Sequence, residues 1–459
     1  MNKITFSNIK KAHFIGIGGI SMSGLAQILH SKGVKVTGSD ISETDLTLLL
    51  RELGIDINIG HSSENLPPDC GLVIHTAAVK PDNPEVLAAN ELKIPFIDRA
   101  ELLGLIMGAY ERSIGVSGTH GKTTTTSLIS EILLLAGYDP TLNVGGIFKG
   151  IGSNFRIGGS GYFVAEACEY FDSFSKFYPF IGVILNIEHD HTDYFKNTNQ
   201  LRGSFHRFAE NVSESGLLVV NSDIHDLDEF IEGLSCKVIT YGEKGDYTAV
   251  NIKFSTEGTS SFDIYYKGDC VAEGVKLNLP GKHNVENALA AFAVAYYLGV
   301  SSKDIGKAMG QFSGAKRRFE TKGEWNGVKI IDDYAHHPTE IAATLAAAKK
   351  CEHKKMYAAF QPHTFSRTKA FMDKFADSFC DADVVLLLDI YSARESDDGS
   401  VHSRDLAEKI TALGIEAYYF ESFEAAGCFL KGRCSEGDMI ITMGAGDIYK
   451  LGEGILWQK

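Results

Sequence analysis

The chain has 459 residues, of which 44% are hydrophobic and 22% are charged, a balance typical of a globular protein. At roughly 150 residues per domain, this length predicts about three domains. The formal charge of −15 argues against nucleic acid as a main partner, because the average surface would repel a phosphate backbone.

Hydropathy and cysteine spacing limit the class of protein further. No apolar run approaches the roughly 20 residues that a membrane-spanning helix needs, and glycines interrupt the apolar run near the N-terminus. We therefore expect a cytoplasmic protein with neither a signal peptide nor a membrane partner. The eight cysteines are scattered without a Cys-x-x-Cys pair, which indicates buried thiols rather than a disulfide or zinc framework.

The N-terminal region has the pattern of half a Rossmann-like unit. An apolar strand near His13 runs into a glycine turn, and the pattern predicts a helix over residues 22–32 and a second strand over residues 34–40. The turn departs from the dinucleotide fingerprint, because Ser21 stands in place of its last glycine, although Asp40 lies at a suitable distance for reading a ribose or a base. The turn could therefore bind NAD or the pyrophosphate of a UDP-sugar.

The most informative stretch is residues 115–126, where an apolar strand enters a glycine-rich loop and then a helix. Glycines let backbone N–H groups turn inward, Lys122 can reach the β- and γ-phosphates, and Thr123 can ligate magnesium. Val116 replaces the first glycine of the strict Walker spacing, so the loop is a variant. A simple tight turn would not explain Lys122 and four consecutive threonines. We expect ATP rather than GTP, since no Asn-Lys-x-Asp element follows.

Acidic residues follow two further strands of the central block, at the strand ends where parallel sheets bind ligands. Glu166 could hold magnesium there, or could be a solvent-facing loop acid. Residues 186–193 bring together three carboxylates and two imidazoles, which favours metal binding or phosphate chemistry. Magnesium, with His191 as an unusual nitrogen ligand, fits best beside a nucleotide loop. A zinc site and a helix-capping role are the alternatives.

A third block follows the basic segment at residues 316–320 and alternates strands with helices, which predicts another α/β domain. Residues 332–338 form a polar cluster directly after a strand. Arg367 could clamp a carboxylate or phosphate with two hydrogen bonds, whereas on a surface helix it would only be solvated.

Five segments together resemble the Mur ligases of bacterial peptidoglycan synthesis, and the resemblance spans essentially the whole chain. These segments are residues 16–24, 118–124, 186–191, 281–287 and 332–338. The resemblance implies a three-domain α/β protein. Its expected parts are a Rossmann-like domain that binds the UDP substrate (1–107), a central P-loop ATPase-like domain that binds ATP (108–316), and a Rossmann-like C-terminal domain that closes on the nucleotide and the amino acid (317–459).

The resemblance also implies roles for single residues. The UDP substrate is expected at Gly18, Gly19, Ser21, Ser23, Asp40 and Thr76. ATP is expected at Gly118, Thr119, His120, Gly121, Lys122, Thr123, Thr124, His283, Asn284, Asn287, Arg318 and Asp333. Within that set, the adenine lies near His283, Asn284 and Asn287, the ribose near Asp333 and the phosphates near Arg318. Lys122 and His336 are the expected catalytic residues, His336 and Arg367 the amino-acid contacts, and Thr123, Glu166 and His191 the magnesium ligands.

The activity implied is ATP-dependent ligation of L-alanine to UDP-N-acetylmuramate, by a monomer or homodimer. Because oxide cannot leave a carboxylate, ATP must first convert the lactyl carboxylate into an acyl phosphate, from which the alanine amine displaces phosphate. Three alternatives remain from the sequence. They are a recycling ligase that attaches a whole tripeptide to the same sugar, an NAD-dependent oxidoreductase, and a nucleotide-regulated binding protein without ligase chemistry.

One departure from the family pattern concerns the second magnesium. Several sister ligases carry a carbamylated lysine shortly after the histidine of the acidic loop, whereas residues 201–207 contain no lysine. We therefore expect no carbamate here, which leaves His191, Glu166 and water to complete the site.

Overall fold

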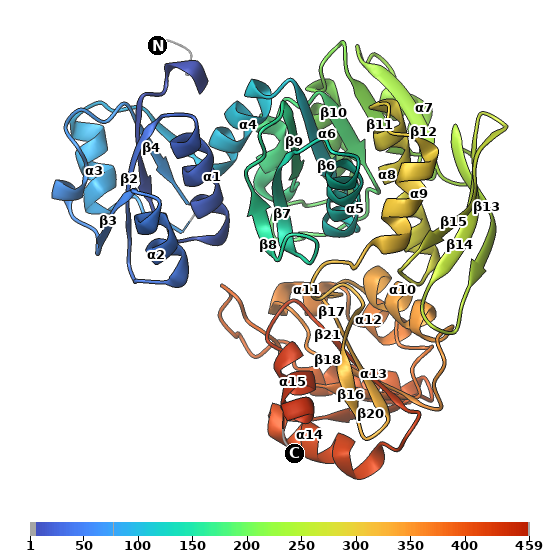
Figure 1. The fold of residues 1–459 in the computed structure, drawn as a ribbon. Helices are drawn as coiled ribbons and strands as arrows, with labels where there is room; N and C mark the ends of the chain where they lie inside the picture. Colours follow the sequence, from blue (N-terminus) through green and yellow to red (C-terminus); the bar gives the residue numbers. More distant parts are fainter. Residues whose placement is uncertain (1–5, 77, 458–459) are drawn as a thin grey trace.

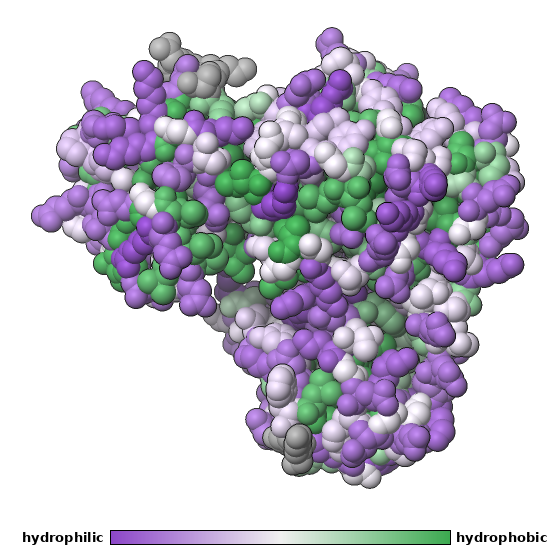
Figure 2. All heavy atoms as spheres, viewed as in Figure 1, coloured by the Kyte–Doolittle hydropathy of each residue, from purple (hydrophilic) through white to green (hydrophobic). Residues whose placement is uncertain are grey.

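The computed structural model describes residues 6–76 and 78–457 and contains three β-sheets, one in each of three α/β domains (Figure 1). The N-terminal and central domains lie side by side, and the C-terminal domain lies beneath the central one in this view. Hydrophilic side chains gather on the visible face where the C-terminal domain meets the central domain (Figure 2). The predicted three-domain α/β fold is confirmed. Among the described residues, no helix combines the length and the apolar character that crossing a membrane requires.

The N-terminal domain is a five-stranded parallel sheet in the order β3-β2-β1-β4-β5. The chain moves to opposite sides of β1 after α1 and after β3, which creates a crevice beyond the carboxyl end of β1, where such sheets bind ligands. The strands are β1 (Lys11–Ile15), β2 (Lys35–Asp40), β3 (Asp56–Ile59), β4 (Leu72–His75) and β5 (Phe96–Asp98), and the helices are α1 (Ile20–Ser31), α2 (Asp45–Glu52), α3 (Pro84–Glu91) and α4 (Arg99–Ala109).

The central domain has a ten-stranded sheet in the order β15-β14-β13-β12-β11-β10-β6-β9-β7-β8. Its middle is parallel and fully buried, and antiparallel pairs extend it at both edges. The strands are β6 (Arg112–Ser117), β7 (Thr141–Phe148), β8 (Ser153–Arg156), β9 (Tyr162–Glu166), β10 (Ile181–Ile184), β11 (Leu217–Asn221), β12 (Lys237–Tyr241), β13 (Tyr247–Phe254), β14 (Ser260–Tyr266) and β15 (Asp269–Leu277).

The helices of the central domain cover this sheet and bring α8 next to the nucleotide loop. They are α5 (Lys122–Leu135), α6 (Thr198–Glu210), α7 (Leu227–Ile231), α8 (Lys282–Tyr297) and α9 (Ser302–Gln311), with a 3₁₀ segment at Tyr170–Lys176. α8 is rich in alanine and is buried along most of its length, so it packs closely against α5. This close packing places the start of α8 beside the start of α5.

The C-terminal domain has a six-stranded sheet in the order β16-β17-β21-β18-β19-β20, antiparallel only at β16. The strands are β16 (Glu320–Trp325), β17 (Val328–Asp333), β18 (Met356–Phe360), β19 (Val384–Leu387), β20 (Glu416–Tyr419) and β21 (Met439–Met443). The helices are α10 (Pro338–Ala348), α11 (Phe365–Ala370), α12 (Met372–Asp377), α13 (Ser403–Ala412), α14 (Phe423–Arg433) and α15 (Tyr449–Trp457).

The structure also locates the two proposed domain boundaries. The boundary after residue 107 falls inside the last turn of α4, two residues before that helix ends. The boundary after residue 316 falls in the connection between α9 and β16.

Candidate active site

The phosphate-binding loop joins β6 to α5. β6 ends at Ser117 and α5 begins at Lys122, and the glycines between them have positive φ angles, 140° at Gly118 and 84° at Gly121. A Cβ atom at Gly121 would lie 2.4 Å from Asn287 Oδ1 on α8. Only glycine fits there, because the backbone is left-handed and the loop packs against α8. The predicted order of strand, loop and helix is present.

The ammonium of Lys122 is held by its own loop. Its Nζ donates hydrogen bonds to the carbonyl oxygens of Gly118 and Thr119, and it contacts both carboxylate oxygens of Glu169, at 3.2 and 3.0 Å. Burial alone would lower the pKa of Lys122, but Glu169 outweighs burial and raises it, so the side chain stays charged. A fixed cation beside a helix N-terminus suits a polyphosphate.

Glu169 is a site residue that the sequence did not reveal. Its side chain is 1% exposed, and its Oε1 lies 3.5 Å from His191 Nε2. Burial would raise the pKa of Glu169, but Lys122 and His191 outweigh burial and lower it, so the carboxylate is ionised. Glu169 comes three residues after the end of β9, in a segment whose sequence shows no helix or strand pattern. The sequence pattern therefore favoured Glu166, which is the last residue of the strand.

Glu166 and Thr123 also lie close to Lys122. The Gly145 N–H of β7 donates to Glu166 Oε1 at 2.6 Å, and the charge of Glu166 contributes to the raised pKa of Lys122. Of the three residues predicted as magnesium ligands, Thr123 follows Lys122 in the chain, Glu166 acts on Lys122 through its charge, and His191 contacts Glu169, the partner of Lys122. This donor set of hydroxyl, carboxylate and imidazole beside a phosphate loop is compatible with a divalent cation.

A cavity of about 420 Å³ opens between the central and C-terminal domains. Eight of the residues predicted to bind ATP line it, and they come from the loop, from α8 and from the C-terminal domain. They are His120, Gly121, Thr124, His283, Asn284, Asn287, Arg318 and Asp333. Burial lowers the pKa of His283 to about 4, so its ring is neutral. A neutral, partly apolar wall suits a base, while the loop side suits phosphates.

Arg318 and Asp333 connect the C-terminal domain to this cavity. Arg318 Nη2 lies 3.4 Å from Thr123 Oγ1, at the start of α5. The Asp333 carboxylate accepts hydrogen bonds from the backbone N–H groups of Phe319 and Ala335, at 2.7 and 2.8 Å. Burial raises the pKa of Asp333 to about 6. Both residues therefore line the cavity, and their roles at the phosphates and the ribose stay predictions.

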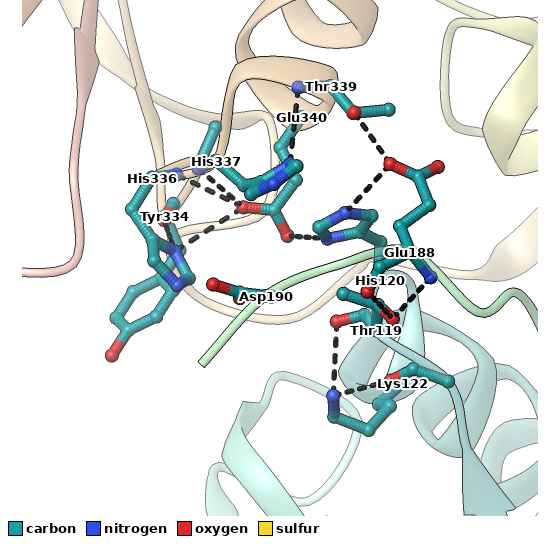
Figure 3. Close-up of polar contacts among 12 residues, drawn as sticks. Thr119, His120, Lys122, Glu188, Asp190, Tyr334, His336, His337, Thr339 and Glu340 are labelled. Carbon is teal, nitrogen blue, oxygen red and sulfur yellow. Dashed lines mark hydrogen bonds and ion pairs between the residues drawn. The ribbon is translucent and has the colours of Figure 1, made fainter. Parts of the chain in front are cut away.

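His120 lies between two carboxylates at the domain junction (Figure 3). Its Nδ1 is 3.1 Å from Glu340 Oε1, and its Nε2 is 3.5 Å from Glu188 Oε2. Burial disfavours the imidazolium, but the charges of Glu340 and Glu188 outweigh it and raise the pKa of His120 to about 9. Thr339 of α10 also donates a hydrogen bond to Glu188, at 2.7 Å. Glu340 was not predicted as a site residue. It stands three residues after the N-cap of α10, where a glutamate is typical of a capping box and indicates no further role.

The two predicted amino-acid contacts lie next to this junction. His336 Nδ1 is 2.9 Å from Tyr334 O, and burial lowers the pKa of His336 to about 3, so the ring is neutral and Nδ1–H is the donor. Arg367 makes a buried, two-pronged ion pair with Asp190, with distances of 2.9 to 3.2 Å. Arg367 therefore holds a carboxylate as predicted, but in this structure the carboxylate belongs to the central domain.

The glycine turn of the N-terminal domain lies beyond the carboxyl end of β1. Gly18 N–H donates to Asp40 Oδ2 at 2.8 Å, and Arg99 Nη1 donates to Ser21 Oγ at 3.0 Å. Ser23 is buried and its hydroxyl donates to the backbone within α1, so its side chain does not face the crevice. Sequence analysis did not select Arg99, whose charge also reaches Cys168 in the central domain.

The remaining predicted substrate contacts are backbone or turn positions. Gly19 is the N-cap of α1, and no side chain caps that helix. Thr76 follows β4. Its methyl group would lie 2.5 Å from a Cβ atom at Gly16, so only glycine fits at position 16. The start of α1 is thus an open helix N-terminus, which favours an anionic group such as a pyrophosphate.

Comparisons with known proteins agree with this geometry. Family models match three consecutive segments, described as the Mur ligase family catalytic domain (residues 11–111), the Mur ligase middle domain (116–295) and the Mur ligase glutamate ligase domain (317–446). A curated UDP-N-acetylmuramate--L-alanine ligase from Agathobacter rectalis is 50% identical over 458 residues, which cover 99% of this chain and 100% of that protein. This chain belongs to the Mur ligase family.

Solved structures of Mur ligases have the same architecture. The UDP-N-acetylmuramate-alanine ligase MurC from Thermotoga maritima aligns with a TM-score of 0.78 and 32% identity, over 97% of this chain and 98% of that one. The UDP-N-acetylmuramate:L-alanyl-gamma-D-glutamyl-meso-diaminopimelate ligase from Neisseria meningitides aligns with a TM-score of 0.60 and 31% identity, over 67% of this chain and 100% of that one. Mur ligases are ATP-dependent ligases, so the oxidoreductase alternative is wrong.

Proposed function

We propose that this Mur ligase joins L-alanine to UDP-N-acetylmuramate and converts ATP to ADP and phosphate. The observation that carries the proposal is 50% identity, over the full length of both chains, to a curated ligase with this activity. The geometry agrees with it, because Gly121 of the phosphate loop lines the cavity, and Lys122, the next residue, pairs with Glu169, which contacts His191.

The proposed reaction has two steps. A carboxylate oxygen of the lactyl group attacks the γ-phosphorus of ATP, and ADP leaves. The amine of alanine then attacks the acyl carbon, so that a C–N bond forms and the C–O bond to phosphate breaks. Both steps concentrate negative charge, which Lys122 and the N-terminus of α5 stabilise in a site closed to water.

We propose that Thr123, Glu166 and His191 hold magnesium, with Glu169 as an additional carboxylate nearby. When bound, magnesium neutralises charge on the phosphate oxygens. Lys122 and Glu169 already form a tight pair without it, so the protein itself keeps the lysine in place and orients the acidic side chains.

For the amino-acid end, we propose that His336, Arg367 and Asp190 receive alanine. A neutral His336, which donates from Nδ1 to Tyr334, leaves Nε2 able to accept a hydrogen bond and thereby orient the amine. Arg367 suits the alanine carboxylate and Asp190 its ammonium group, so an incoming zwitterion can insert into the existing ion pair.

The recycling ligase is the second candidate, because the peptide ligase of Neisseria meningitides is 31% identical to this chain. We favour the alanine ligase, since its curated example is 50% identical over the whole chain. We also propose that Gly18, Gly19, Ser21, Asp40 and Thr76 bind the UDP moiety. Cytoplasmic location and a monomeric or dimeric state remain predictions.

The test is phosphate release with ATP and UDP-N-acetylmuramate present, comparing L-alanine, the tripeptide and no amino compound. We expect L-alanine to stimulate release by at least ten-fold over the other two conditions. Stimulation by the tripeptide alone would support the recycling ligase. Equal release in all three conditions would contradict ligase activity and would indicate a nucleotidase or a nucleotide-regulated binding protein.

A further inference from the structure

A cluster of possible metal ligands lies at the junction of the central and C-terminal domains, apart from the acidic residues around Lys122. It consists of His120, Glu188 and His337, whose ligand atoms all lie within 4.8 Å of one another. His120 and Glu188 belong to the central domain, and His337 is the N-cap of α10 in the C-terminal domain. The cluster therefore spans two domains that are expected to move relative to each other.

Two nitrogen atoms of this cluster have no hydrogen-bond partner. His337 is 4% exposed, and its Nε2 is buried and unpaired. His120 Nε2 is also buried and makes no hydrogen bond, but it forms an ion pair with Glu188 at 3.5 Å, so of the two nitrogens His337 Nε2 is the one without a partner. Unpaired buried polar atoms are unusual in folded proteins and call for an explanation such as an ion. The two rings lie 4.7 Å apart between their centroids.

The contact on the other side of the His120 ring agrees with metal binding, whereas His337 would have to give up one long hydrogen bond. His120 Nδ1 faces Glu340 at 3.1 Å, an arrangement in which the carboxylate accepts Nδ1–H and leaves Nε2 for a metal. His337 Nδ1 accepts a hydrogen bond from Thr339 N at 3.4 Å, which is long. Metal binding at Nε2 would move the ring proton to Nδ1 and break that bond. Glu340 would still accept hydrogen bonds from the backbone at this end of α10.

We propose that His120, His337 and Glu188 bind a zinc ion across the junction between the central and C-terminal domains. Two imidazole nitrogens, one carboxylate oxygen and water form the open tetrahedral set that zinc prefers, whereas magnesium prefers oxygen ligands. At zinc–ligand distances of about 2.0–2.2 Å, the ligand atoms must approach to roughly 3.4 Å. A small closing movement of the domains achieves this.

Zinc at this site would act against nucleotide binding. His120 and Glu188 line the cavity between the domains, so an ion there occupies its wall and joins the two domains. Zinc binding to His120 Nε2 releases the proton from that atom. The zinc ion then supplies the positive charge beside Glu188. The proposal does not depend on the identity of the ligase substrates, because it concerns the nucleotide-free chain.

The test measures zinc bound per chain by equilibrium dialysis of the full-length, nucleotide-free protein against Zn²⁺ alone. The variants are His337→Asn, which keeps a capping acceptor for α10 but removes Nε2, and Glu188→Gln, at a partly exposed side chain. The matched control is His402→Asn, since His402 caps α13 through the same kind of capping box far from the cluster. Circular dichroism checks that each variant is folded.

We expect the wild-type chain and His402→Asn to bind one more zinc ion than His337→Asn and Glu188→Gln, or to bind it at least ten-fold more tightly. The eight cysteines are present in all four proteins, so zinc bound by thiols cancels in the comparison. Equal zinc content and affinity in all four proteins would overturn the proposal. That result would not bear on the proposed ligase activity. In the same way, a negative result in the phosphate-release test would not bear on the zinc proposal.

Discussion

Among single residues, Lys122 is the one on which the proposed catalysis depends most. Its ammonium is held by loop carbonyls and by the buried carboxylate of Glu169. A polyphosphate entering the loop offers a stronger set of acceptors, so the lysine is poised to exchange partners without having to become charged. Glu169 keeps the lysine oriented until that exchange.

Replacing this lysine should therefore abolish catalysis. We predict that Lys122→Ala lowers kcat for phosphate release by at least about 100-fold, because one preorganised charge at the phosphates is lost. Lys349→Ala is the control, since it removes the same charge from a surface pair with Asp381. Circular dichroism should show both variants folded. Near wild-type turnover by the folded Lys122→Ala protein would refute the assigned role.

A residue of the site could be predicted from the sequence only where it belongs to a local sequence motif. Gly121, Lys122 and Asn287 sit in motifs with a physical meaning, and the structure brings them together. Glu169 and Arg99 carry no such pattern. Their contacts, Glu169 with Lys122 and Arg99 with Ser21, join segments far apart in the chain and therefore depend on tertiary packing.

At the scale of elements, the site is made by loops that leave parallel strands. The turn after β1, the loop after β6, the acidic loop after β10 and the histidine segment after β17 all follow carboxyl ends of strands. Apolar runs predicted these strands correctly because parallel strands are buried on both faces. The polar region at residues 242–274 predicted antiparallel strands, and β13, β14 and β15 pair in that way. The antiparallel β7–β8 pair was not predicted, because half-buried strands of mixed polarity resemble loops.

The N-terminal sheet is joined to α3 by one buried carboxylate. Glu85 is fully buried and accepts hydrogen bonds from Ser39 Oγ at 2.6 Å and Asn65 Nδ2 at 2.8 Å, and it lies 3.2 Å from His13. Burial would raise the pKa of Glu85, but these three partners outweigh it and lower the pKa to about 2.

This network should make the domain sensitive to acid. Because the pKa of Glu85 is lower in the folded chain than its ordinary value of 4.5, its contribution to stability is present above pH 4.5 and is lost as the pH falls toward 2. We predict that the advantage of the wild type over Glu85→Gln in free energy of unfolding shrinks by about 2 kcal/mol between pH 6 and pH 3.

The measurement is urea denaturation at both pH values, followed by circular dichroism. Glu408→Gln serves as a control, because this exposed glutamate lies on α13 in another domain. A difference between wild type and Glu85→Gln that does not change with pH would contradict the account of the network.

At the scale of the whole molecule, the N-terminal and central domains share one cluster of buried hydrophobic side chains, which includes Leu103 of α4 and Phe174, whereas the C-terminal domain has core clusters of its own. Polar contacts also cross both junctions. Asp190–Arg367 and Glu188–Thr339 connect the central and C-terminal domains, and Lys176–Asp98 connects the central and N-terminal domains. The sequence predicts each sheet from its own pattern. It does not predict these contacts, because the partners lie far apart in the chain and each side chain alone resembles a solvated surface group.

Under the proposed function, each domain would bind one reactant: the UDP substrate at the N-terminal domain, the phosphates at the central domain and the amino acid at the C-terminal domain. Closure of the domains would then bring a sugar-borne carboxylate to the γ-phosphate beside Lys122 and an amine to the same carboxylate. In this reaction, phosphate activates the carboxyl group before the amine attacks.

The most direct test follows an oxygen atom. UDP-N-acetylmuramate labelled with ¹⁸O in its lactyl carboxylate is incubated with the enzyme, ATP and L-alanine, and the released phosphate is examined by mass spectrometry. Attack of the carboxylate on ATP followed by displacement of phosphate predicts one ¹⁸O atom in each phosphate released during ligation. Unlabelled phosphate accompanying the ligated product would contradict the account.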